Sequence, residues 1–134
     1  MNYLVPLGRI LFCIIFIKSS FGHFSSTTVE YAASHGVPLA SIAVPLSGVM
    51  ALLGGLSVAI GYRAKWGAFL LVLFLVPVTL MMHNYWAISD PMMAQMQEIN
   101  FFKNLSMLGG TILIWYFGAG PITLDAWLSS RSKS

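Results

Sequence analysis

The stretch LLGGLSVAIGYRAKWGAFLL, residues 52–71, joins two long apolar runs through a short basic loop. The first run begins near Val37 and the second ends near Ile88, while the loop between them holds Arg63 and Lys65. A helix needs about 20 apolar residues to cross a bilayer core of about 30 Å, so each run predicts one transmembrane helix. Because Lys and Arg in short loops stay on the cytoplasmic side, the loop also predicts the direction of both helices.

The composition of the whole chain indicates a membrane protein, so we expect the lipid bilayer as a partner. Of its 134 residues, 57% are hydrophobic and 8% are charged, whereas soluble domains carry about 25% charged residues. The net charge of +3 comes from residues dispersed along the chain, so we expect no nucleic-acid partner. Cys13 is the single cysteine, which excludes an intrachain disulfide and a CxxC redox motif.

Four segments are long and apolar enough to span the bilayer, at about residues 3–22, 37–61, 66–88 and 99–118. The C-terminal tail is basic, like the 61–65 loop, whereas the other two loops carry carboxylates and no Lys or Arg. The positive-inside rule then places both termini in the cytoplasm. We predict an all-α, polytopic, four-transmembrane-helix bundle in the cell (inner) membrane, with residues 1–134 as one membrane domain.

Two connecting segments predict short helices at the membrane surface. Thr27 and Glu30 have the spacing of a capping box, and Gly36 suits the end of a helix at about residues 28–35. In the tail, Gly120 and Pro121 end the fourth span, and a second short helix is expected at about residues 123–128.

Small residues recur every fourth position in the second span, and such stripes let helix backbones approach closely in lipid. The stripe consists of Ala43, Ser47, Ala51, Gly55 and Ala59. We interpret it as a packing face within the chain, with a homo-oligomer contact as the alternative. The pairs Gly54–Gly55 and Gly109–Gly110 are candidate points where two helices meet.

Polar side chains in three spans share one predicted depth, about 6 to 8 Å below the outer boundary at about 1.5 Å per helical residue. Ionisable groups in a span are costly and mark candidate functional sites. This candidate ligand-binding layer consists of Lys18, His83, Asn84, Lys103 and Asn104. Arg9 is expected on the other side of the first span, near the inner boundary. We interpret it either as an anchor for a lipid phosphate or as a partner of other groups inside the bundle.

Three members of the layer also have a simpler interpretation. Lys18 and Lys103 can extend to the headgroups, and His83 can be an interfacial histidine bonded to a backbone carbonyl. The sequence contains no HxxxH pair or carboxylate–histidine cluster, so we predict neither a metal nor a haem site. No catalytic residue is predicted either.

Six motifs in this order resemble the DoxX family of small membrane proteins. They are LGRILF (7–12), YAASHGVP (31–38), LLGGLSVAIGYRAKWGA (52–68), TLMMHNYWA (79–87), FFKNLSMLGG (101–110) and GPITLD (120–125). The resemblance implies a four-helix membrane bundle related to subunits of thiosulfate:quinone oxidoreductases and of a mycobacterial oxidoreductase complex. It also implies distant relatives that include a eukaryotic cargo receptor and a receptor chaperone. Met50 and Ala51 stand where many DoxX members carry an acidic residue.

Three functions follow as hypotheses. The first is an accessory membrane subunit of a redox complex, in which the polar layer binds a quinone or a small anion, His83 exchanges a proton and a soluble or membrane redox partner supplies electrons. No cofactor is expected within the chain itself. The alternative is a non-catalytic membrane scaffold or chaperone for another membrane protein, and the third hypothesis is a small-solute transporter.

Overall fold

The computed structural model describes residues 1–133, and the regular elements of this part are all helical. In chain order they are α1 (Leu4–Ser20), the 3₁₀ turn η1 (Phe21–Phe24), α2 (Ser26–Ser34), α3 (Ala40–Ile60), α4 (Ala64–Met82), the 3₁₀ turn η2 (Tyr85–Ala87), α5 (Pro91–Phe117) and α6 (Leu124–Arg131). The all-α class predicted from the sequence is therefore confirmed.

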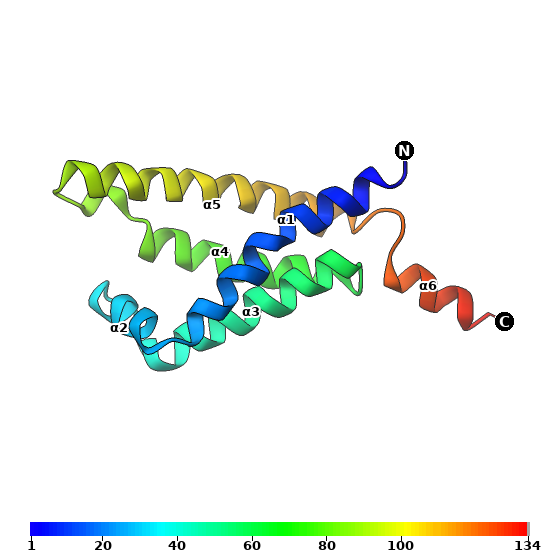
Figure 1. The fold of residues 1–134 in the computed structure, drawn as a ribbon, viewed down its shortest axis with the longest axis horizontal. Helices are drawn as coiled ribbons and strands as arrows, with labels where there is room; N and C mark the ends of the chain where they lie inside the picture. Colours follow the sequence, from blue (N-terminus) through cyan, green and yellow to red (C-terminus); the bar gives the residue numbers. More distant parts are fainter. Residues whose placement is uncertain (134) are drawn as a thin grey trace.

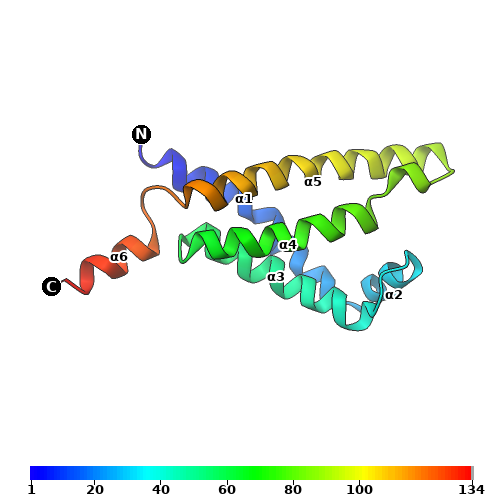
Figure 2. The same cartoon turned by 180° about the vertical axis from the view of Figure 1, so that it is seen from behind.

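The long helices pack side by side, and α1 also meets α5 directly, where a Cβ on Gly110 would lie 3.0 Å from the Phe12 ring (Figure 1). α3 contacts both α1 and α4, and α4 also contacts α5. Seen from either side, α1 runs obliquely, starting beside the last turns of α5 and ending beside α2 and α3 (Figure 2). Both chain ends and α6 lie at one end of the bundle, which we name the α6 end, and η1, α2 and η2 lie at the opposite α2 end.

Among the described residues, three helical segments are long and apolar enough to cross a membrane: Leu4–Phe24, Ala40–Ile60 and Ala64–Ala87. They correspond to the first three predicted spans. The fourth predicted span lies inside α5, which begins at Pro91 and carries Gln97, Glu98 and Lys103 in its first half. The chain is thus a helical membrane protein, and α5 is longer and more polar than the sequence interpretation allowed.

Several helix ends differ from the predicted span ends for local reasons. The third apolar segment runs to Ala87, close to the predicted end, but α4 itself ends at Met82, because His83 leaves the helical backbone conformation at φ −124° and ψ 34°. His83 and Asn84 therefore follow the helix instead of lying within it. The second span starts at Ala40 because the preceding Leu39 is left-handed, with φ 51°. α2 is capped by the Ser25 hydroxyl, which accepts from the Thr28 amide, and not by a Thr27–Glu30 capping box.

The main core lies where α3 crosses α1 and α4. Its buried members are Cys13, Phe16, Ala51, Val58, Ala68, Leu71, Phe74 and Leu75. Glycines bring the helices together, since a Cβ on Gly54 would lie 2.9 Å from the Gly67 carbonyl oxygen of α4. A Cβ on Gly55 would instead lie 3.3 Å from the Phe16 Cβ of α1. The two adjacent glycines therefore face different helices.

The predicted small-residue stripe lies partly within these contacts. Ala51 and Gly55 are buried, whereas Ala43, Ser47 and Ala59 are half-buried. The Ala59 carbonyl accepts a hydrogen bond from Arg9 of α1, so this end of the stripe also faces the first helix. The homo-oligomer alternative stays a prediction.

Candidate functional site

A cleft of about 400 Å³ opens at the α2 end, where η1 and α2 approach the start of α3 and the last turns of α4. The α4 residues of the lining are all apolar, and its polar groups come from η1, α2, α3 and from His83, which follows α4. The lining residues are His23, Thr28, Tyr31, Ala32, Val37, Pro38, Ala43, Val44, Ser47, Pro77, Val78, Met81, Met82 and His83.

Local sequence signals build the α2 wall of this cleft. After α2, Gly36 takes a positive φ of 80°, and the Val37 amide donates back to the Ala32 carbonyl at 3.1 Å. This turn reverses the chain, so that Ala32 of α2 packs with Ala40 and Val44 of α3 in a small second core. Met82, at the end of α4, packs against the same cluster, so the cleft joins segments distant in the sequence.

His23 and Ser47 form a hydrogen-bonded pair in the cleft lining. The Ser47 hydroxyl donates to the Val44 carbonyl at 2.6 Å, and it lies 2.7 Å from His23 Nδ1. Because one hydroxyl carries a single proton, the geometry makes Nδ1 the donor and leaves Nε2 as an acceptor in the neutral ring. The centroid of the His23 ring also lies 5.6 Å from that of the Phe74 ring.

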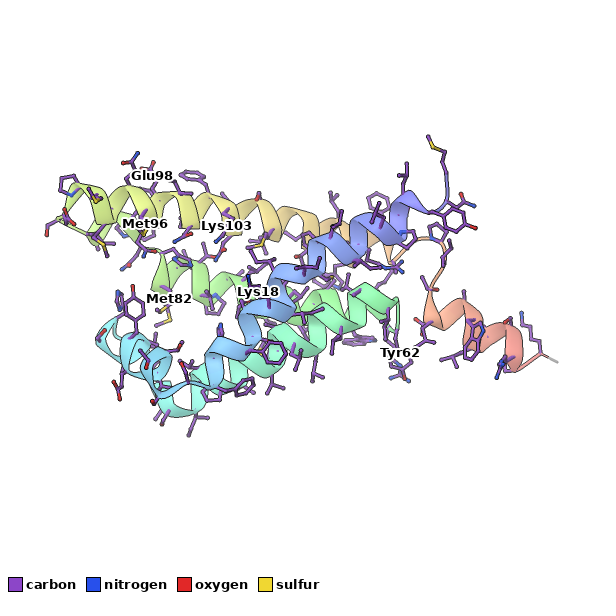
Figure 3. The ribbon with its side chains drawn as sticks, in the orientation of Figure 1. Lys18, Tyr62, Met82, Met96, Glu98 and Lys103 are labelled. Atoms are coloured by element: carbon purple, nitrogen blue, oxygen red, sulfur yellow. The ribbon has the colours of Figure 1, made fainter. Side chains whose placement is uncertain are left out.

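Two residues of the predicted polar layer bond to partners outside the layer rather than to its other members. His83 Nδ1 lies 2.7 Å from the Gln97 amide oxygen, and the Lys103 ammonium donates to Asn100 at 3.2 Å. Asn104 is buried on α5, and Lys18 is exposed on α1. Figure 3 labels Lys18 and Lys103 on two helices that separate toward the α2 end.

No hydrogen bond or ion pair within residues 1–133 joins any two of the five predicted layer residues. His83 is the one member that lines the cleft, whereas Asn84 follows it outside the lining. The role of the five residues as one ligand site stays a prediction. Sequence reasoning did not select His23, Tyr31 or Met82 as site residues, because nothing in their spacing shows that η1, α2 and α4 converge.

Arg9 occupies a separate position at the α6 end, where it is 6% exposed. Its guanidinium donates to the Ala59 carbonyl at 3.1 Å, the Ala119 carbonyl at 2.6 Å and the Ile122 carbonyl at 2.8 Å. Positive φ values at Gly118, Gly120 and Ile122 shape the segment whose carbonyls face Arg9. The side chain thus joins α1 and α3 to the segment after α5.

Comparison with known proteins identifies relatives of the whole chain. A model of the SURF4 family matches residues 1–128. The inner membrane protein YphA of Escherichia coli (strain K12) is 29% identical over 124 residues, which cover 91% of this chain and 88% of YphA. The inner membrane protein YqjF of the same organism is 26% identical over 129 residues, which cover 95% of this chain and 93% of YqjF.

The ER-derived vesicles protein ERV29 of Saccharomyces cerevisiae is 28% identical over 124 residues, which cover 92% of this chain and 33% of ERV29. The chain therefore spans nearly the full length of the bacterial relatives and about a third of the yeast relative. No solved structure matches the chain. The bacterial relatives and the apolar helices confirm the predicted multi-pass inner-membrane location.

The match across residues 1–128 shows that the resemblance to the DoxX family was wrong. The quoted motifs combine small, aromatic and basic residues at the ends of apolar segments. Such residues serve helix packing and interface anchoring in membrane proteins generally, so they do not distinguish one family of small helical bundles from another.

Proposed function

The chain belongs to the SURF4 family, and from this premise we propose that it is a non-catalytic membrane adaptor that binds another protein. The proposed occupant of the cleft at the α2 end is an apolar segment of a membrane or exported protein. One relative is named for ER-derived vesicles, which supports a role in handling other proteins rather than in a redox reaction.

The observation that carries this proposal is the cleft itself. Its volume of about 400 Å³ falls in the range of about 300 to 1,000 Å³ that is typical of ligand pockets. Met81 and Met82 supply flexible, polarisable surface that adapts to different apolar side chains. Tyr31, His23 and His83 add polar groups that orient a bound segment.

The redox interpretation loses its main support, because it depended on the resemblance to the DoxX family. Quinone binding, proton exchange by His83 and an electron-supplying partner remain untested predictions. The adaptor proposal needs none of them, since recognition of a polypeptide segment requires burial of apolar surface and a few hydrogen bonds.

We also propose that α5 is a fourth span and that the single membrane domain has both termini in the cytoplasm. The two chain ends lie at the same end of the bundle, as an even number of crossings requires (Figure 1). Arg63 and Lys65 lie at that end, together with Arg131 of α6, so the positive-inside rule favours the cytoplasm for it.

Site-specific photocrosslinking in cells tests the adaptor proposal. A photoreactive residue replaces Met82 in the cleft or, as a matched control, Leu113, which is 59% exposed on α5. We expect discrete cross-linked polypeptides from position 82 but not from position 113. Adding Ala43→Trp, which fills the cleft, should remove them while the melting temperature stays within a few degrees.

Equal cross-linking at positions 82 and 113 would contradict a specific site. Cross-links from position 82 that persist with Ala43→Trp would contradict binding inside the cleft. A product with twice the mass of the chain would identify a second copy as the occupant and would overturn the proposed partner.

A further inference from the structure

A second pocket, of about 450 Å³, lies at the α6 end between the α3–α4 loop and the segment that follows α5. Gly61, Arg63, Lys65 and Trp66 form one side, and Gly118 and Asp125 contribute to the other. We propose that this pocket binds the phosphate of an anionic glycerophospholipid. The proposal is independent of the adaptor function, because the pocket and the cleft lie at opposite ends of the bundle.

Specific contacts join the two walls of the pocket. The Asp125 carboxylate accepts from the Arg63 backbone amide at 2.8 Å, and the Asp125 amide donates to the Gly61 carbonyl at 3.2 Å. Gly61 has a φ of 73°, and a Cβ there would lie 2.6 Å from Thr123 Cβ. The two walls are therefore joined by two hydrogen bonds and by the close packing of Gly61 against Thr123, and neither cationic side chain takes part in these contacts.

The charged groups of the lining favour an anion. Within residues 1–133, neither the Arg63 guanidinium nor the Lys65 ammonium forms an ion pair with a carboxylate. Asp125 is the one acidic residue in the lining, and one of its oxygens is occupied by the Arg63 amide. Two cations against one carboxylate leave the lining with a net charge of +1.

The position of the pocket indicates a lipid rather than a soluble anion. It lies where the apolar helix α3 ends, at Ile60, and α4 begins, at Ala64, which is the level of the headgroups for helices that cross the membrane. Trp66 lines the pocket and is 70% exposed, as expected for an indole in the interface. Basic pockets at this level attract the headgroups of anionic lipids.

Native mass spectrometry of the full chain in detergent tests the proposal. Phosphatidylglycerol and phosphatidylcholine with the same acyl chains are titrated against the wild type and against Arg63→Asn/Lys65→Gln. Asn suits the left-handed backbone of Arg63, whose φ is 47°. The matched control, Arg131→Asn/Lys133→Gln, removes the same charge from the tail. We expect phosphatidylglycerol to bind more tightly than phosphatidylcholine, and the loop variant to lose this affinity by roughly tenfold.

Three results would overturn the proposal. The first is equal binding of the two lipids to the wild type. The second is an equal loss of affinity in the loop and tail variants, which would indicate diffuse attraction. The third comes from a competition that needs no variant: displacement of phosphatidylglycerol by equimolar glycerol 3-phosphate would identify a soluble anion as the ligand. Failure to displace the lipid supports the proposal.

Discussion

At the scale of single residues, Arg9 shows how a buried charge is accommodated without a carboxylate. Its planar guanidinium donates to backbone carbonyls at three separate places, Ala59, Ala119 and Ile122. Lys cannot reproduce this fork of donors. We therefore expect Arg9→Lys to lower the free energy of unfolding by about 2 kcal/mol, because buried carbonyls lose their donors. Thermal unfolding in detergent should show a melting temperature lower by several degrees.

Lys18→Gln is the control for this prediction. Lys18 is exposed on the same helix, so its replacement should change the free energy of unfolding by less than about 0.5 kcal/mol. Equal melting temperatures for the wild type and Arg9→Lys would show that the carbonyl contacts contribute little to stability.

At the scale of elements, the crossing of α3 and α4 depends on glycines. A Cβ on Gly67 would overlap the Ser57 hydroxyl and lie 3.0 Å from the Gly54 carbonyl oxygen. Since helix backbone cannot yield as a flexible side chain does, we expect Gly67→Ala to destabilise the protein by about 1 to 3 kcal/mol. The melting temperature in detergent measures the effect.

Gly109→Ala on α5 is the matched substitution, because a Cβ there meets nothing within 4 Å. It should leave the melting temperature unchanged or raise it, since Ala is favoured over Gly in a helix by up to about 1 kcal/mol. A larger loss of stability from Gly109→Ala than from Gly67→Ala would contradict this account of the packing.

At the scale of the whole molecule, the proposed topology predicts opposite exposure for the two ends of the bundle. In a Cys13→Ser background, single cysteines replace Ser34 at the α2 end or Ser130 at the α6 end. A membrane-impermeant maleimide added to intact bacterial spheroplasts should label position 34 and not position 130. Position 130 should react only after the membrane is opened.

The labelling pattern also tests whether α5 is a span. If α5 lay on the outer surface, position 130 would be labelled in intact spheroplasts together with position 34. That result would leave three spans, in agreement with the three most apolar helical segments, and would refute the four-span arrangement.

Apolar run length and charge placement were sufficient to predict a helical membrane protein, because the energetic cost of burying polar backbone and charges in lipid depends on local composition. The same information located the α3–α4 loop and the short helices α2 and α6 to within a few residues. Run length and charge did not predict the conformations of Leu39 and His83. Leu39 is left-handed just before α3 begins, and His83 leaves the helical conformation where α4 ends. These helix boundaries depend on the backbone conformation of single residues, which the distribution of apolar residues does not predict.

The contacts between helices could not be read from spacing. Depth and helical face did not identify the partner of His83, whose imidazole bonds to Gln97, a residue that the sequence interpretation placed outside the fourth span. Likewise, Arg9 had two equal interpretations until the fold brought Ala119 and Ile122 to it, 110 and 113 residues away. Composition and hydrophobic periodicity describe a single helix and the solvent around it. The cleft, the Arg9 contacts and the basic pocket form where segments distant in the sequence meet, and only the packing of the helices decides where they meet.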